Sequence, residues 1–135
     1  MVVDTSALVA MLLGEPERDQ FITTLAEAKD PLISAGTLLE ASIVIQSKLG
    51  EVGLADLDEL LATAGVRCVA VDLAQVHAAR EAFARFGKGR DAAGLNYGDC
   101  FAYALAKVTQ VPLLFKGEDF RRTDVVARGR LTPAA

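Results

Sequence analysis

The sequence predicts a three-layer α/β/α domain with a central parallel sheet of four to five strands. Short apolar runs alternate along the chain with longer amphipathic stretches, which is the pattern of strands joined by right-handed helical crossovers. The short runs are apolar without interruption, as expected for strands covered by helices on both faces. With 135 residues, 52% of them hydrophobic, the chain is long enough for a single domain over residues 1–130, followed by a short tail at 131–135.

Each predicted element is delimited by residue types that start or stop helices and strands. The first strand is 1–3, and the helical spacing of 6–13 stops at the turn containing Gly14 and Pro16. The remaining predicted segments are helices at 17–28, 36–49 (ending at Gly50), 54–64, 73–86 and 97–109, strands at 31–34, 66–71, 111–115 and a short edge strand at 125–127, a loop at 87–95 and a turn at 117–121.

Composition excludes several classes of protein. No apolar run approaches the roughly 20 residues of a membrane span, and the first residues lack the basic region of a signal peptide, so we expect a cytoplasmic protein. Cys68 and Cys100 lie inside apolar stretches and are predicted to be buried, reduced thiols. Because His77 is the one histidine, a zinc finger is not indicated.

The net charge of −4 hides an uneven distribution. Residues 1–79 hold 12 acidic and 4 basic side chains, whereas residues 80–135 hold 6 acidic and 10 basic ones. Two solvated faces of different sign would explain this, but so would a basic rim beside an acidic centre. The second arrangement permits a phosphate-bearing partner.

Asp4 directly follows the first predicted strand, at the strand end where ligands bind in parallel α/β folds. It is also a good residue to cap the next helix. Since Thr5 and Ser6 can cap that helix themselves, we expect Asp4 to be free to face the crevice.

Glu40 and Asp99 are carboxylates inside apolar helices. The helical neighbours of Glu40 three and four residues away include Gly36 and Ile43, so it does not lie on an ordinary solvated face. Asp99 stands three residues after Asn96, which fits a capping box, but the helix that follows is apolar on nearly every side. Gly98 permits a close approach to whatever Asp99 faces.

Asp119 and Glu118 follow the strand at 111–115 in a glycine turn. An exposed turn explains Glu118 adequately, whereas the apolar Phe120 fixes the direction of Asp119 better, so Asp119 is the preferred fourth acid. If these four acids meet, each pair of charges about 4 Å apart costs about 4 kcal/mol at an effective dielectric near 20. An oxygen-only donor set without histidine selects Mg²⁺ or Mn²⁺, which activates water for phosphodiester cleavage.

The motifs that contain these acids, 2–7, 96–104 and 115–120 with Glu40 between them, together resemble the PIN-domain family. More narrowly, the chain is similar to the VapC-type ribonuclease toxins of bacterial VapBC toxin–antitoxin pairs, in whose order and spacing the motifs stand along the whole chain. The resemblance implies a PIN-like fold and a Mg²⁺-dependent endoribonuclease, with Mn²⁺ able to substitute. It also implies a homodimer, an RNA substrate, inhibition by a cognate VapB-type antitoxin, contact with DNA only through that antitoxin, and no membrane.

The resemblance further implies that Asp4, Glu40, Asp99 and Asp119 form the catalytic site. Asp4 and Asp99 match positions that bind metal directly, and Glu40 matches a further ligand or a group that orients water.

Four polar neighbours are candidates for supporting these acids or contacting substrate: Thr5, Ser6, Asn96 and Lys116. Thr5 or Ser6 could donate a hydrogen bond to Asp4, and Lys116 could contact a phosphate. Helix capping by the first three and simple solvation of the lysine stay open as alternatives.

Two other functions remain open. A phospho-receiver module would use Asp4, Asp72 and Lys116, although a receiver needs paired acids at the end of the first strand and gives no role to Glu40 or Asp99. A catalytically silent binding protein with the same fold is the other alternative, because acidic positions alone do not prove turnover.

Overall fold

The computed structural model describes residues 1–89, 91 and 94–128, so the predicted tail at 131–135 lies outside the described residues. The elements, in chain order, are β1 (Val2–Val3), α1 (Thr5–Leu12), α2 (Arg18–Glu27), β2 (Leu32–Ser34), α3 (Ala35–Thr63), β3 (Arg67–Val69), α4 (Leu73–Phe86), α5 (Tyr97–Thr109), β4 (Leu113–Leu114), the 3₁₀ turn η1 (Phe120–Arg122) and β5 (Ala127–Arg128).

The described strands form one parallel sheet in the order β3-β2-β1-β4-β5, which confirms the predicted parallel sheet. β1 lies at the centre, where Val2 pairs with Leu32 on one side and Leu113 on the other. The chain after β1 leads to β2 and then β3, whereas the chain after β3 returns to β4 on the other side of β1. The strand order therefore reverses between β1 and β4, and in such sheets ligands bind outside the carboxyl ends of the strands at this switch point.

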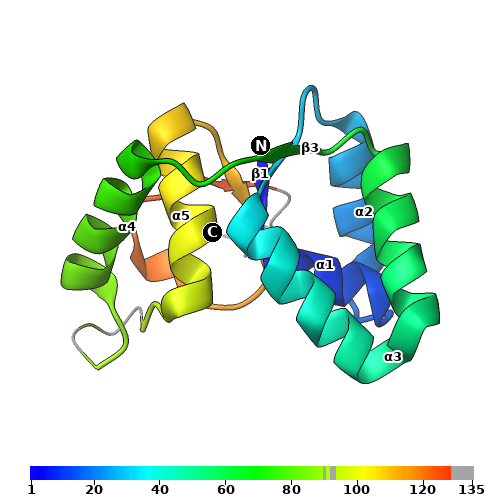
Figure 1. Ribbon diagram of the computed structural model, residues 1–135. Coiled ribbons are helices and arrows are strands. Elements are labelled where there is room, and N and C mark those ends of the chain that lie inside the picture. Colours follow the sequence, from blue (N-terminus) through cyan, green and yellow to red (C-terminus); the bar gives the residue numbers. More distant parts are fainter. Residues whose placement is uncertain (90, 92–93, 129–135) are drawn as a thin grey trace.

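Alternate residues of the central strands pack into two different helical layers, as the two-residue period of a strand requires. One layer consists of α1, α2 and α3. The other consists of α5, with α4 packed against α5 (Figure 1). The residues that face the first layer are Val3, Ile33 and Leu114, and those that face the second are Val2, Leu32 and Leu113. Both faces of the sheet centre are thus covered, which confirms the predicted three-layer α/β/α architecture.

The helices expected at 36–49 and 54–64 are both present: α3 consists of two helices that meet at a kink at Gly50, where φ is 69° and the backbone is not helical. One detail of the prediction is wrong. Cys68 was expected to be buried, but it is exposed because β3 is an edge strand whose Arg67 and Cys68 face solvent. Cys100 is buried as predicted, and both thiols are free.

Within the residues described, no helix is both long enough and apolar enough to pass through a bilayer.

Candidate active site

Asp4 is a buried carboxylate at the end of the central strand. Its side chain is 3% exposed, and its backbone N–H donates to the carbonyl oxygen of Leu114 in β4 (3.0 Å). Oδ2 accepts hydrogen bonds from the backbone N–H (3.0 Å) and the hydroxyl (2.7 Å) of Ser6, so Asp4 is itself the N-cap of α1. The expectation that Thr5 and Ser6 would cap in its place is wrong, because the extended backbone at Asp4 aims its own carboxylate at the first free N–H groups.

The other oxygen of Asp4, Oδ1, is buried and has no hydrogen-bond partner among the described residues. Burial raises the pKa of Asp4 to about 6; the hydrogen bonds from Ser6 oppose this shift and the negative charge of Glu40 adds to it. One carboxylate oxygen of Asp4 therefore stabilises the start of α1, whereas the other is available to bind a ligand.

Glu40 reaches this site from α3. Its Oε1 accepts a hydrogen bond from the Thr5 hydroxyl (2.6 Å), so Thr5 holds Glu40 and Ser6 holds Asp4. The carboxylate lies against the backbone of Gly98 at the start of α5, where a Cβ atom would overlap it. The close approach that Gly98 permits is thus made by Glu40, and the negative charge lies beside a helix N-terminus, where the macrodipole favours it.

Asp99 belongs to the capping box that its spacing from Asn96 predicts. The backbone N–H of Asn96 donates to Asp99 Oδ2 (3.0 Å), and the backbone N–H of Asp99 donates to Asn96 Oδ1 (2.9 Å). Burial raises the pKa of Asp99 to about 7, against the effect of the Asn96 hydrogen bond. The negative charges of Asp4 and Asp119, and a side-chain hydrogen bond with Asp119, raise it further.

Asp119 is therefore the acid of the glycine turn that interacts with the site. It is exposed, as is Glu118, but Glu118 is occupied by an ion pair with Arg121 (2.6 Å). Lys116 is also occupied, because its ammonium lies 3.1 Å from Glu15 Oε1 and 2.9 Å from Glu17 Oε2. Its backbone N–H, in contrast, donates to the Ser6 hydroxyl (2.9 Å) and joins the loop to the site.

The four acids form a chain of neighbours. The charge of Glu40 raises the pKa of Asp4, and the nearby Asp4 and Asp119 both raise the pKa of Asp99. None of the groups that set the pKa of Asp4 or Asp99 is cationic. Within the described residues, however, no three acidic, histidine or cysteine side chains come close enough to coordinate one ion together.

This arrangement fits Mg²⁺, because this ion is commonly held by one or two carboxylates and keeps several waters. Asp4 and Asp99 would supply the two carboxylates, with the buried, unpartnered Oδ1 of Asp4 as one donor. Glu40 and Asp119 would be further acidic neighbours of such an ion, and the oxygen-only donor set is the set that hard cations prefer.

The structure does not assemble the phospho-receiver site. Asp72 caps α4, where its Oδ1 accepts the backbone N–H of Gln75 (2.9 Å), and it follows the edge strand β3 rather than a central one. Lys116, the lysine of that hypothesis, is bound by two glutamates.

Sequence reasoning missed Glu15 and Glu17 as residues near the site. They flank Pro16 in the turn between α1 and α2, and only the helix-breaking function of that turn was apparent. The signal available in the sequence was the pair of acids on either side of Pro16, directly after the helix that begins at the site.

Comparisons with known proteins identify the family and the fold. The sequence profile described as "PIN domain" matches residues 1–126. A protein of Mycolicibacterium smegmatis named Ribonuclease VapC is 55% identical over 127 residues, which cover 94% of this chain and 98% of that one.

Two solved structures share the fold. The Mycobacterium tuberculosis toxin VapC20, described as cleaving the sarcin–ricin loop, superposes with a TM-score of 0.75 at 17% identity, covering 93% of this chain and 95% of that one. VapBC2 from Rickettsia felis, bound to a DNA fragment from its promoter, gives a TM-score of 0.74 at 16% identity, covering 93% and 94%.

Replacing Asp4 by Asn should change how stability depends on pH. The folded-state pKa of about 6 lies above the ordinary value of 3.8, so the folded state binds the proton more tightly and wild type loses stability as the pH rises from about 4 to about 7. Asn keeps a capping oxygen for Ser6 and does not ionise. Without divalent metal, we expect Asp4→Asn to gain stability over wild type on the order of 2 kcal/mol between about pH 4.5 and pH 8.

Urea unfolding at several pH values in the presence of a chelator measures this difference. Asp58→Asn, on an exposed position of α3, is the matched control and should follow wild type throughout. A constant difference between Asp4→Asn and wild type over the whole range would contradict the burial argument.

Proposed function

Because this chain belongs to the PIN-domain family and is a VapC-type ribonuclease toxin of a toxin–antitoxin system, we propose that Mg²⁺ or Mn²⁺ bound by Asp4 and Asp99 is required for its activity. The reaction class is endonucleolytic hydrolysis of RNA phosphodiester bonds. We place this activity in the cytoplasm. The matched family profile and the high identity to a named VapC ribonuclease support the family and the reaction class.

One observation carries the metal requirement: within the described part of the chain, the buried Oδ1 of Asp4 has no hydrogen-bond partner, and Asp99 stands near it with a raised pKa. A buried ionised carboxylate without a compensating charge costs several kcal/mol, so these two acids hold either protons or a cation. At neutral pH the cation is the favoured occupant, because the oxygen-only donor set suits Mg²⁺ and neither pKa lies far above 7.

When bound, the ion supplies charge neutralisation and an activated water at the scissile phosphate. The residues of the chain then have separable tasks. Ser6 holds Asp4 and Thr5 holds Glu40, so each carboxylate keeps one fixed orientation. Glu40 and Asp119 flank the pair Asp4 and Asp99, in position to orient water or accept its proton.

The site favours this function over the two alternatives. A receiver would need Asp72 and Lys116 beside Asp4, and both are engaged elsewhere. A silent binding protein would have no use for two neighbouring acids whose pKa values lie near neutrality. The cleavage experiment below separates the enzyme from the silent protein directly.

We expect purified protein to cleave RNA only when Mg²⁺ or Mn²⁺ is present, and a chelator to abolish cleavage. Asp99→Asn should lower the rate by about a hundredfold or more, because a metal-binding carboxylate is lost while the amide oxygen can still accept the Asn96 N–H. The measurement is the initial rate on a mixed RNA substrate, with the exposed Asp58→Asn as the control of equal charge change. Equal rates for Asp99→Asn and wild type would sink the proposal.

We propose that a VapB-type antitoxin inhibits the enzyme by placing a basic side chain among the four acids, since charge complementarity favours it there. A solved neighbour of this fold is a VapBC complex on promoter DNA, which supports such a partner and contact with DNA through the antitoxin. Asp99→Asn should weaken antitoxin binding by about tenfold or more in calorimetry, and Asp58→Asn should not. Unchanged affinity in Asp99→Asn would place the antitoxin away from the acids.

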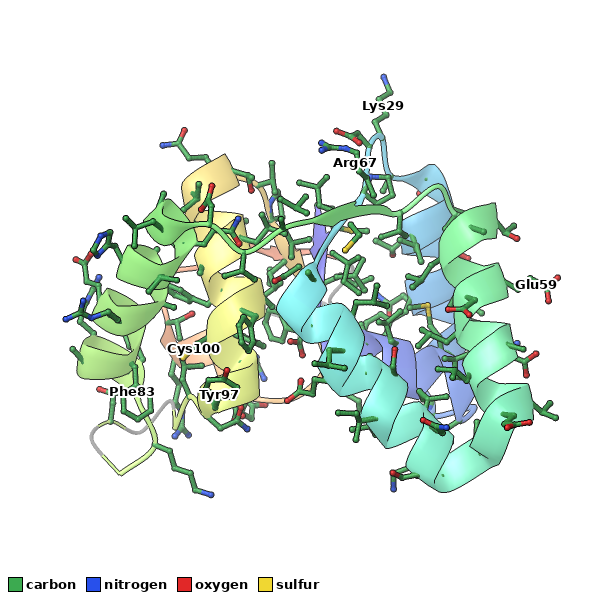
Figure 2. All side chains as sticks on the ribbon, viewed as in Figure 1. Lys29, Glu59, Arg67, Phe83, Tyr97 and Cys100 are labelled. Atoms are coloured by element: carbon green, nitrogen blue, oxygen red, sulfur yellow. The ribbon has the colours of Figure 1, made fainter. Side chains whose placement is uncertain are left out.

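We also propose a homodimer through the apolar face beside the site. A groove of about 650 Å³ runs between α4 and α5, and Phe83, Tyr97 and Cys100 gather there (Figure 2). Tyr97 is 79% exposed, and Leu39 of α3, on the same turn as Glu40, is 63% exposed. A face with both a groove and protruding apolar side chains can be self-complementary, as a two-fold interface requires.

Tyr97→Asp should convert the dimer to a monomer, because it puts a charge into the centre of this face. Light scattering after size-exclusion chromatography measures the mass. Val52→Asp, at a comparably exposed apolar position beyond the bend of α3, is the control and should stay dimeric. A monomeric wild type, or a dimeric Tyr97→Asp, would contradict this interface.

A further inference from the structure

Lys116 is fixed at both its backbone and its side chain. The backbone N–H donates to the Ser6 hydroxyl, and the ammonium is shared between Glu15 and Glu17 at 3.1 and 2.9 Å. All three side chains of this ion-pair cluster are only about one-quarter to one-third exposed. The two glutamates hold the pKa of Lys116 above its usual range, Glu17 more than Glu15, so the ammonium stays charged.

The loop that Lys116 begins carries Asp119. Its two ends are anchored by the buried rings of Phe115 and Phe120, whose centroids lie 5.2 Å apart. Between them, Gly117 has φ of 102° and Gly117, Glu118 and Asp119 are exposed. Lys116 therefore supplies polar contacts that tie this stretch to α1 and to the turn before α2.

The hydrogen bond from the Lys116 backbone to Ser6 also connects Lys116 to the acids of the site. Ser6, which accepts the Lys116 N–H, donates its own hydroxyl proton to Asp4 Oδ2 (2.7 Å). At the other end of the loop, Asp119 lies close enough to Asp99 to raise the pKa of that carboxyl. A displacement of Lys116 would thus loosen the orientation of Asp4 and the position of Asp119 together.

We propose that Lys116, clamped by Glu15 and Glu17, is a positioning residue that holds the 116–119 loop against Ser6 and so keeps Asp4 and Asp119 in register with Asp99. The inference rests on the proposed function for its kinetic consequence. It replaces the expectation that Lys116 contacts a substrate phosphate, because an ammonium that binds two carboxylates would have to leave both to reach the RNA.

The decisive variant is Glu15→Ala with Glu17→Ala, which leaves Lys116 in place but removes its clamp. We expect the Lys116 amide, a hydrogen-bond donor to Ser6, to exchange its hydrogen about tenfold faster by NMR. We expect kcat for RNA cleavage to fall about tenfold to a hundredfold with KM changed less, because misplaced groups lose rate rather than binding.

Glu51→Ala with Glu59→Ala is the matched control. It removes the same charge from exposed positions of α3, where Glu59 points into solvent away from α5 (Figure 2). Any general effect of charge on RNA binding appears in this control and can be subtracted. If Lys116 were a phosphate-binding residue, freeing it would tighten RNA binding or speed cleavage beyond the control, and this result would overturn the proposal.

Two lysine variants complete the test. Lys116→Arg, which can still bridge two carboxylates, should retain most activity, whereas Lys116→Met should resemble the Glu15/Glu17 variant. Combining Lys116→Met with the two alanines should add little, since the groups act as one unit; a multiplicative loss would contradict the cluster. If wild type cleaves no RNA, the proposed function fails, but the amide exchange still decides whether the clamp holds the loop.

Discussion

The burial of the Asp4 carboxylate is the constraint on which the site depends. β1 is the central strand, and Val2 and Val3 are fully buried between the two helical layers, so the next residue enters the crevice at the switch point of the sheet. One oxygen of Asp4 accepts hydrogen bonds from Ser6, and the other has no partner among the residues that the structure describes. A fold retains such a group where a proton or a cation compensates it, so on the proposed function Asp4 both caps α1 and binds the metal ion.

Three consecutive residues connect the acidic centre to the rest of the molecule. The negative charge of Asp4 raises the pKa of Asp99, and Thr5 donates a hydrogen bond to Glu40 of α3. Ser6 links Asp4 to the backbone N–H of Lys116 after β4. These residues start α1, where the backbone is fixed by the cap and by the central strand before it. The site therefore draws its precision from a rigid strand–helix junction, to which the longer and more exposed loop of Asp119 is attached.

Local patterns in the sequence predicted those features that local physics determines. The capping box of Asn96 and Asp99 follows from a spacing of three residues, and the strands follow from apolar runs. Partners distant in the chain could not be predicted in this way: Thr5 and Glu40 are 35 residues apart, and Lys116 and Ser6 are 110 apart. The same limit explains Cys68, whose apolar neighbours in sequence did not reveal that β3 lies at a sheet edge.

On the proposed function, the acidic centre would also determine how RNA and the inhibitor compete for the protein. An RNA backbone is a polyanion, so four neighbouring carboxylates would repel it until their charge is neutralised. A divalent cation neutralises the crevice and leaves room for a phosphate beside it, whereas a basic side chain from a partner neutralises the same charge and fills the space. On the proposed function, the activating metal ion and the inhibiting partner therefore neutralise the same negative charge. The oxygen of Asp4 that has no partner among the described residues and the raised pKa of Asp99 mark where this charge lies.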